Sequence, residues 1–305
     1  MINVSSKSDT LRYARAEGFL YARPETIRMV AENRVPKGDV AATVRAAGIL
    51  AAKHTSDWIV FCHPIPLDWI ELQVEALEDR LKITAEVESV WKTGVEMEAI
   101  TAVSAGLLNA YDMLKPHDKE MRMGEIKLAK KKGGKSQYRE EFDRPLKAAV
   151  LVISDSTFAG KRKDNSGRVI REMLQNFPVE VAVYEILPDD AEKIRARVSE
   201  LVQNEKCDLV ITTGGTGFGP RDTTPEAVRP LLEKSAPGIG EKMRDFGSRH
   251  TPYAMLSREI AGTIGNSLVL TLPGSSKGAR ESMQALFPGV LHIFPMLWGG
   301  GHGKK

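Results

Sequence analysis

The first half of the chain alternates apolar and polar residues along several short segments. Residues 69–75 read Trp-Ile-Glu-Leu-Gln-Val-Glu, and residues 81–87 follow the same period of two. This period is typical of antiparallel strands with one exposed face. A helical stretch begins at Pro24, a residue favoured in the first turn of a helix. The pattern predicts strands at 13–22 and 121–128, a hairpin at 69–90, and helices from 24, at 40–53 and at 95–114.

The second half has short uninterrupted apolar runs that are separated by helical segments. One run, residues 146–153, ends in the polar pair Ser154-Asp155, as a buried parallel strand does. Strands that alternate with helices predict a three-layer α/β domain with a mostly parallel sheet. The predicted strands lie at 147–154, 179–187, 207–212 and 267–272, and the predicted helices at 165–176, 190–204 and 224–234.

A segment rich in lysine and glycine, from Lys127 to Arg144, separates the two patterns. It contains little that a core would bury, so we interpret it as a connection between domains. We therefore predict a first domain at residues 1–140 and a second at 145–305, because domains of about 150 residues are common. The glycine-rich end, residues 299–305, is expected to be a loose tail.

Composition narrows the class of protein further. Hydrophobic residues make up 42% of the chain and charged residues 27%, as in globular proteins. No apolar run reaches the ~18–20 residues of a membrane span, and the first residues lack a secretory signal. Cys62 and Cys207 fall in different predicted domains, so we expect a cytoplasmic protein without disulfides. A net charge of +3 does not by itself indicate nucleic-acid binding.

Several ionisable residues of the first half lie within or beside apolar segments, where charge is costly unless it is paired or functional. Glu98, Asp112 and Lys115 share one predicted helix, and their spacing is close to whole turns, so they can line a single groove. The alternative for Asp112 and Lys115 is an exposed ion pair. The alternative for His63 is a histidine that Pro64 fixes in a tight loop. The cysteine and histidines of this half match no structural zinc spacing.

Five motifs occur in a fixed order along the first half. They are Ala-Ala-Lys53-His, Phe-Cys62-His63-Pro64, Lys-Thr-Gly-Val-Glu96-Met97-Glu98, Tyr-Asp112-Met-Leu-Lys115 and Lys-Gly-Gly-Lys135. As a set they resemble the cyclic pyranopterin monophosphate synthase family of molybdenum cofactor biosynthesis, over about residues 1–140. We accordingly expect this half to fold as an α+β ferredoxin-like sandwich.

The resemblance implies conversion of a cyclised dihydro-GTP intermediate into cyclic pyranopterin monophosphate, with release of pyrophosphate. Cations suit the triphosphate, and an acid–base pair suits the rearrangement of the ring. The implied catalytic residues are Lys53, Asp112, Lys115 and Lys135. The implied substrate-binding residues are Cys62, His63, Pro64, Glu96, Met97 and Glu98. His54 departs from the arginine that the family usually has, and Pro116 follows Lys115. No tightly bound cofactor is expected in this half.

In the second half a predicted strand opens into the glycine-rich loop Gly214-Gly215-Thr216-Gly217, and a helix begins near Pro225. Backbone N–H groups in such a loop can hold a phosphate, although a plain tight turn is the alternative. The loop completes neither a P-loop nor a dinucleotide-binding motif.

Two aspartates follow predicted parallel strands. Asp189 and Asp222 should therefore reach the same edge of the sheet, where ligands bind in α/β proteins. Either Asp189 or the adjacent Asp190 is also expected to cap a helix. A third strand ends near Ser275 and Lys277, which places a hydroxyl group and a cation at that edge.

The motifs Thr-Thr-Gly-Gly-Thr-Gly, Arg-Asp-x-Thr-Pro, Leu-Pro-Asp and Leu-Pro-Gly-Ser together resemble the molybdopterin adenylyltransferase family, over about residues 145–298. The resemblance implies transfer of AMP from ATP to the terminal phosphate of molybdopterin. Asp189 and Asp222 are implied as catalytic residues and as ligands of Mg²⁺. The other implied binding residues are Ser154, Asp155, Gly214, Gly215, Thr216, Gly217, Ser275 and Lys277.

A pterin-binding or assembly module without catalysis is the alternative for the second half, and the paired aspartates argue against it. Ser276 stands where many relatives have proline. The resemblances imply a hexameric first domain with sites between subunits and a trimeric second domain, so we expect a homo-hexamer. We expect neither a membrane nor a nucleic-acid partner, because no aromatic residues interleave the lysines of 127–135.

Overall fold

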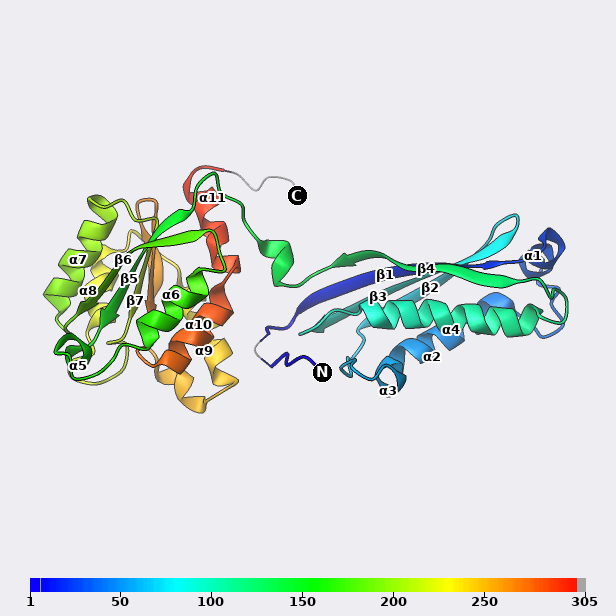
Figure 1. Ribbon diagram of the computed structural model, residues 1–305, viewed down its shortest axis with the longest axis horizontal. Helices are drawn as coiled ribbons and strands as arrows, with labels where there is room; N and C mark the ends of the chain where they lie inside the picture. Colours follow the sequence, from blue (N-terminus) through cyan, green and yellow to red (C-terminus); the bar gives the residue numbers. More distant parts are fainter. Residues whose placement is uncertain (6, 301–305) are drawn as a thin grey trace. The chain divides into compact units, whose positions relative to one another are not determined.

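The computed structural model describes residues 1–5 and 7–300, apart from the side chains of residues 135 and 136. The chain divides into two compact units, Met1–Gln137 and Tyr138–Lys305, and each has its own sheet and core (Figure 1). Most of the predicted tail lies outside the described residues. In the part of the chain that is described, no helix is long and apolar enough to cross a membrane.

The first unit is a four-stranded antiparallel sheet with helices on one face. Its strands, in the spatial order β2-β3-β1-β4, are β1 (Thr10–Tyr21), β2 (Trp69–Ala76), β3 (Arg80–Trp91) and β4 (Arg122–Lys132). Its helices are α1 (Pro24–Ala31), α2 (Val40–Lys53), α3 (Thr55–Trp58) and α4 (Glu96–Leu114). Helices α2 and α4 pack side by side against the sheet (Figure 1). The predicted α+β arrangement, an antiparallel sheet with helices on one face, is confirmed.

The alternation of residue types along β1 produces the packing of this unit. Ala14, Ala16 and Leu20 are fully buried on the face that the helices cover, because side chains two apart point the same way. Gly18 lies between them, where an added Cβ atom would come within 2.9 Å of Val103 Cγ1 on α4. A larger residue at this position would therefore push α4 away from the sheet.

Strand β4 corrects the prediction for the lysine-rich segment, which is not entirely a connection. Residues 127–132 belong to β4, which pairs only with β1 and so forms an edge of the sheet. An edge strand tolerates charged side chains because one of its sides faces solvent. Lys127 also forms an ion pair with Glu17 at 3.2 Å. Polar composition alone could not separate such a strand from a linker.

The second unit is a six-stranded sheet between two layers of helices. Its strands, in the order β6-β5-β7-β10-β9-β8, are β5 (Leu146–Ile153), β6 (Val179–Leu187), β7 (Leu209–Thr213), β8 (Lys234–Ser235), β9 (Ala261–Ile264) and β10 (Ser267–Leu272). Its helices are α5 (Asp155–Phe158), α6 (Ser166–Leu174), α7 (Ala191–Gln203), α8 (Thr224–Val228), α9 (Pro237–Ser248), α10 (Ser276–Leu286) and α11 (Ile293–Leu297). The unit also has the short 3₁₀ helices η2 (Arg229–Leu231), η3 (Pro252–Leu256) and η4 (Gly289–His292). A further 3₁₀ helix, η1 (Lys135–Tyr138), lies at the boundary between the two units.

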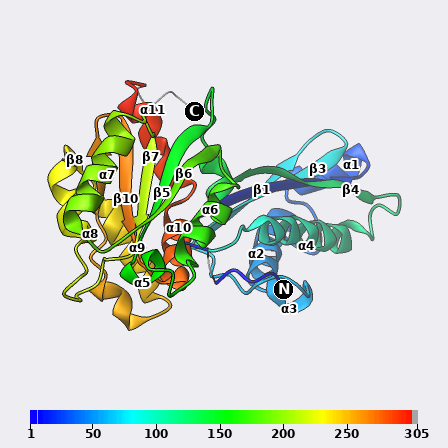
Figure 2. The same ribbon diagram turned by 60° about the vertical axis from the view of Figure 1, so that its left-hand side comes forward.

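Strands β6, β5, β7 and β10 are parallel to one another. Strand β9 pairs antiparallel with β10, and β8 pairs antiparallel with β9. Along β5, alternate residues enter two different cores: Val150 packs with α6, α9 and α10, and Leu151 packs with α7 and α8. Figures 1 and 2 show these helix groups on opposite faces of the sheet. The prediction of a three-layer α/β domain with a mostly parallel sheet is confirmed.

The helix predicted at 224–234 is wrong in its second half. Helix α8 ends at Val228, and residues Lys234–Ser235 form β8, which pairs with β9. Pro230 lies within the intervening 3₁₀ helix, and proline lacks the N–H group that a longer α-helix would need.

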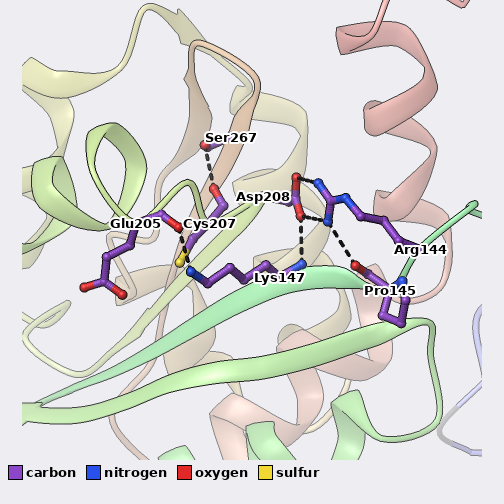
Figure 3. A network of polar contacts seen from close by, with 7 residues as sticks. All are labelled: Arg144, Pro145, Lys147, Glu205, Cys207, Asp208 and Ser267. Carbon is purple, nitrogen blue, oxygen red and sulfur yellow. Dashed lines mark hydrogen bonds and ion pairs between the residues drawn. The ribbon is translucent and has the colours of Figure 1, made fainter.

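A polar network joins the starts of three strands at the amino-terminal edge of this sheet (Figure 3). The guanidinium group of Arg144 donates two hydrogen bonds to the Asp208 carboxylate, at 2.7 and 2.8 Å. The Lys147 N–H group donates to the same carboxylate at 2.7 Å, and the Asp208 carbonyl oxygen accepts from Leu268 N at 2.8 Å. Burial opposes ionisation of Asp208, but Arg144 and Lys147 lower its pKa overall.

We expect Asp208→Asn to destabilise the second unit by about 1–3 kcal/mol, because one buried acceptor becomes an amide that cannot serve both partners. The lowered pKa makes this contribution present above pH ~4 and lost as the pH falls further. Calorimetry at pH 7 checks the loss. Asp245→Asn is the matched control, since the exposed Asp245 carboxylate forms ion pairs with Lys242 and Arg249 on α9; equal losses in both variants would contradict the prediction.

Candidate functional site

In the first unit, a buried carboxylate lies at the start of α4. Glu98 is 2% exposed, and its Oε2 atom has no hydrogen-bond partner among the described residues. The Cys62 thiol donates to Glu98 Oε1 at 3.9 Å. Cys62 comes from the loop that follows α3, so the fold brings two of the predicted motifs together at one end of α4.

Burial is the main reason that the pKa of Glu98 rises to about 7, and the neighbouring charge of Glu96 adds to the effect. Burial and then Glu98 itself raise the pKa of the Cys62 thiol. Near neutral pH, Glu98 is therefore divided between its acid and its carboxylate form. A group with these properties can both donate and accept a proton.

The remaining motif residues at this end are more exposed. Lys53 is the last residue of α2 and is exposed, His63 is half-buried in the loop after α3, and Pro64 and Met97 are exposed. The Lys131 ammonium group lies 3.5 Å from Glu96 Oε1. Lys135 follows β4, but its side chain lies outside the described residues.

Asp112 and Lys115 lie at the opposite end of α4. Lys115 Nζ is 2.6 Å from Asp112 Oδ1, and Lys37 Nζ is 2.9 Å from Asp112 Oδ2. Hydrogen bonds from Lys115 and Lys37 lower the pKa of Asp112 to about 2. The ion pair that the sequence analysis gave as the alternative for these residues is therefore observed, and Lys37 is a partner that it missed because only the tertiary fold brings it there.

The two ends of α4 cannot share one small groove within a protomer. Glu98 and Asp112 lie on similar helical phases, but fourteen residues of α-helix separate them by about 21 Å along the axis. The angular positions of these residues around the helix predict a single groove, but the rise along the helix axis separates them. One chain thus presents two separate groups: Glu98 with Cys62 and His63, and Asp112 with Lys115 and Lys37.

In the second unit, a cleft of about 330 Å³ lies at the carboxyl edge of the parallel strands. Predicted residues from four strand ends line it: Ser154 after β5, Asp189 after β6, Gly214, Gly215 and Asp222 after β7, and Ser275 after β10. Because parallel strands end at the same edge, segments far apart in sequence meet there.

The glycine-rich loop needs its glycines for close backbone contacts. Gly214 has a φ of +107° and Gly215 a φ of +62°, in the region that side chains disfavour. A Cβ atom on Gly214 would come within 2.2 Å of the Ile153 carbonyl oxygen. The Thr224 hydroxyl group donates to the Gly214 carbonyl oxygen at 2.8 Å. The loop therefore has a fixed shape against β5.

Asp189 and Asp222 both line the cleft. Burial raises the pKa of Asp189, and the charges of Asp155 and Asp222 raise it further. Asp189 Oδ2 accepts a hydrogen bond from Asp155 N at 2.8 Å. Asp190 caps α7 by accepting from Glu192 N and Lys193 N. The expected cap is therefore Asp190, which leaves Asp189 available to the cleft.

Other predicted residues lie just outside this lining. Arg258 donates to the carbonyl oxygens of Gly217 at 2.8 Å and Asp222 at 2.7 Å, and Arg258 N donates to the Thr216 carbonyl oxygen at 3.1 Å. The Asp155 carboxylate pairs with Arg221 at 2.7 Å. Thr216, Gly217 and Asp155 thus support the loops around the cleft. Arg258 is a positioning residue that the sequence analysis missed.

The cleft also contains two cations that the motifs did not indicate. Arg162 and Lys163 line it from the loop between α5 and α6. The Lys-Arg-Lys run at 161–163 was the available signal, although such a run is usually a solvated surface. These side chains place positive charge beside Asp189 and Asp222.

The donor set of the cleft matches a magnesium ion that a nucleotide helps to hold. Among the described residues no group of three His, Cys, Asp or Glu side chains is placed to hold a metal ion. Mg²⁺ is commonly bound by one or two carboxylates together with substrate phosphates and waters. Asp189 and Asp222 could supply those carboxylates, so the residues fit this mode of binding and exclude a cage made of protein alone.

We expect Glu98→Gln to remove a pH dependence from the stability of the first unit. Between its ordinary pKa of 4.5 and its folded pKa of about 7, Glu98 holds a proton in the folded state that the unfolded chain has lost. Its stabilising contribution is thus complete below pH 4.5 and lost as the pH rises through 7. Above pH 7 the glutamine variant should be more stable than the wild type, by at most about 3 kcal/mol.

Calorimetry of the full chain at pH 5 and pH 8 measures this difference. Glu96→Gln, in the same helical turn, is the control, because Glu96 is less buried and pairs with Lys131. A Glu98→Gln variant that keeps the pH dependence of the wild type would show that Glu98 is ionised throughout.

Comparison with known proteins assigns a family to both halves of the chain. The MoaC family model matches residues 1–134, and a model described as a probable molybdopterin binding domain matches residues 149–292. A "Cyclic pyranopterin monophosphate synthase" of Thermomicrobium roseum is 48% identical over 47% of this chain and 88% of its own.

Two relatives match along nearly the whole chain. A "Molybdenum cofactor biosynthesis bifunctional protein" of Chlorobaculum tepidum is 42% identical over 99% of this chain and 96% of its own. A protein with the same name from Synechococcus elongatus is 36% identical over 99% of each chain. The chain therefore belongs to the family of molybdenum cofactor biosynthesis bifunctional proteins.

Proposed function

We propose that the protein is a bifunctional enzyme of molybdenum cofactor biosynthesis. The first unit would convert cyclised dihydro-GTP into cyclic pyranopterin monophosphate, with release of pyrophosphate. The second would transfer AMP from ATP to molybdopterin. The observation that carries the proposal is the cleft where Asp189, Asp222 and the glycine-rich loop meet, in a chain whose full-length relatives are bifunctional proteins.

In the first unit, Glu98 is the best-supported proton donor and acceptor. Its raised pKa suits transfer near neutral pH, and Cys62 contacts it from the loop that also contains His63. Asp112 has the opposite property, because its lowered pKa keeps it ionised. Its role would be to hold Lys37 and Lys115 in place for the substrate triphosphate, with Lys53 and Lys135 as further cations.

The separation of the two groups along α4 supports a site shared between subunits of a homo-oligomer. The Glu98 group of one protomer would then face the Asp112 group of its partner. Exposed apolar side chains surround the Glu98 end: Trp58, Val60 and Phe61 are 56%, 81% and 75% exposed. Such a patch is typical of a surface that another subunit covers. A hexamer fits this proposal and the ferredoxin-like topology expected of the family.

Mixing two inactive variants tests the shared site. We expect Glu98→Gln and Asp112→Asn each to have little synthase turnover, measured as cyclic pyranopterin monophosphate formed. When the two chains are co-expressed, random assembly gives about a quarter of the sites two intact halves, so activity should return to about that fraction. Co-expressed chains that stay as inactive as the separate variants would place the whole site within one protomer.

In the second unit, the groups in the cleft suit a phosphoryl transfer. An oxygen of the terminal phosphate of molybdopterin would attack the α-phosphorus of ATP, and pyrophosphate would leave. Backbone N–H groups of Gly214 and Gly215 would hold a phosphate, and Arg162 and Lys163 would bind the leaving pyrophosphate. When bound, Mg²⁺ would neutralise charge on the transferred group. Asp189 and Asp222 would hold that ion.

A pterin-binding module without catalysis is the alternative for this unit. It shares the cleft and the glycine-rich loop, but it has no need for a half-buried Asp189 whose ionisation is opposed by its burial and by nearby carboxylates. The raised pKa of Asp189 indicates unfavourable charge that a bound cation would relieve. This feature favours the transferase.

We expect Asp222→Asn to lower adenylylation by about a hundredfold or more, because it removes a charge that acts where the transition state forms. Binding of molybdopterin should change much less. The assay mixes the full chain with molybdopterin, ATP and Mg²⁺ and measures adenylylated product and pyrophosphate, with EDTA abolishing both.

Asp190→Asn is the matched control, because asparagine caps a helix as well as aspartate does and Asp190 serves as a cap. It should retain full activity. Wild-type protein that binds molybdopterin but forms no product at any Mg²⁺ concentration would establish the binding-module alternative instead.

A further inference from the structure

The segment between α5 and α6 carries three consecutive exposed cations, Lys161, Arg162 and Lys163, and has neither helix nor strand. We call residues 159–165 the basic loop. Arg162 and Lys163 line the cleft, and none of the three cations forms an ion pair with another residue in the described part of the chain. A loop holds cations over a cleft only if other contacts fix its backbone, because ordering a mobile loop on binding costs conformational entropy.

Both ends of the basic loop are fixed by hydrogen bonds. At its start, the N–H groups of Lys161 and Arg162 donate to the Ser156 carbonyl oxygen at 2.9 and 3.1 Å. At its end, Asp164 Oδ1 accepts from Gly167 N at 3.0 Å and from the Ser166 hydroxyl group at 3.3 Å. The Asp164 carboxylate therefore satisfies an N–H group in the first turn of α6.

The second oxygen of this carboxylate joins the basic loop to the sheet. Asp164 Oδ2 accepts a hydrogen bond from the Tyr184 hydroxyl group on β6. An added Cβ atom on Gly167 would come within 2.6 Å of that hydroxyl oxygen, so glycine at this position lets α6 and β6 approach. Burial and then the hydrogen bond to Asp164 raise the pKa of Tyr184. Its hydroxyl group therefore keeps its proton and remains a donor at neutral pH.

The partner of Asp164 matters for the charge in the cleft. Asp164 follows Lys163 directly, yet it pairs with an uncharged phenol and not with a cation of its own loop. The pair fixes the backbone and leaves the positive charge of Arg162 and Lys163 available to an anion. Strand β6 ends at Leu187, two residues before Asp189. One strand thus determines the position of an acidic residue and of the cationic loop opposite it.

We propose that Tyr184 and Asp164 are positioning residues that hold Arg162 and Lys163 over the cleft for the leaving pyrophosphate group of the nucleotide. The inference rests on the proposed transferase function and identifies what keeps its phosphate-binding cations in place. The phenol acts through the carboxylate, and the carboxylate acts through the backbone of the basic loop. The alternative is a structural pair that caps α6 and affects stability without affecting phosphate binding.

Tyr184→Phe tests the proposal, because it removes one hydroxyl group and leaves the charge of the cleft unchanged. Hydrogen–deuterium exchange of peptides that cover residues 159–166 is measured in the full-length protein during titration with inorganic pyrophosphate and Mg²⁺. Slower exchange in these peptides reports binding at the basic loop, so pyrophosphate bound by the first unit does not contribute. We expect faster exchange without ligand and about tenfold weaker pyrophosphate binding, because a hydrogen bond to a charged acceptor is lost.

A double-mutant cycle separates positioning from a general loss of stability. Arg162→Gln/Lys163→Gln should also weaken pyrophosphate binding, which stays measurable because the glycine-rich loop still holds a phosphate. Adding Tyr184→Phe to this variant should weaken binding by less than about twofold, because no cation remains to be positioned. An equal effect of Tyr184→Phe in both backgrounds would show that the phenol acts by another route, and would overturn the proposal.

Tyr253→Phe is the matched control, because it removes the same atom from a side chain of η3 that is 73% exposed. It should bind pyrophosphate as the wild type does. If Tyr184→Phe fails to fold, Gly167→Ala separates the same pair, since its Cβ atom would come within 2.6 Å of Tyr184 Oη and 2.7 Å of Asp164 Oδ2; it should weaken binding similarly.

Two further results have opposite consequences. Wild-type affinity for pyrophosphate in folded Tyr184→Phe would leave the pair only a structural role and overturn the proposal. Wild-type protein that shows the expected coupling but forms no adenylylated molybdopterin would contradict the transferase and leave the role of Tyr184 and Asp164 intact.

Discussion

Contact between backbones at the carboxyl edge of the second sheet determines the geometry of the cleft. Gly214 lies against the carbonyl oxygen of Ile153, and an added Cβ atom on Gly274 would come within 3.0 Å of Gly214 Cα. The loops after β5, β7 and β10 therefore touch without side chains between them. The backbone N–H groups of the glycine-rich loop take their positions from this packing.

The two units use buried carboxylates in different ways. Asp208 is fully hydrogen-bonded by Arg144 and Lys147, so it stabilises the fold and stays ionised. Glu98 lacks comparable donors, because its Oε2 atom has no hydrogen-bond partner among the described residues, and a buried carboxylate without donors is costly. Asp189 is intermediate, with one backbone donor and unfavourable charges nearby. Asp208 and Glu98 are both buried, so they differ in their hydrogen bonding more than in their burial.

Much of the fold could be predicted from local patterns. Helix α2 has the predicted bounds because of its apolar spacing, and Asp39 caps its start. The mostly apolar strands β5, β7 and β10 were recognisable as short apolar runs. The errors occurred where tertiary context decides the structure. Strand β4 is polar because it lies at an edge, and β8 is too short to carry a pattern of its own.

In the candidate site, too, local sequence patterns predict some residues and only the tertiary fold reveals others. Asp189, Asp222 and Gly214 were predictable because strand ends of a parallel sheet meet at one edge. Lys37 and Arg258 were not, since their partners lie far away in sequence, and the basic run that contains Arg162 is typical of a solvated surface. Helical phase aligns Glu98 with Asp112, but the rise of about 1.5 Å per residue separates the two ends of α4 too far for one small groove.

The lysines of β4 have a consequence beyond their ion pairs. The free side of this strand carries repeated positive charge, and its pairing with β1 is interrupted by two irregularities in register. A second sheet that approached this side would meet electrostatic repulsion and an uneven row of backbone groups. The β4 edge of this sheet is thereby protected against strand addition, so copies of the chain that meet at this edge are kept from forming a continuous intermolecular sheet.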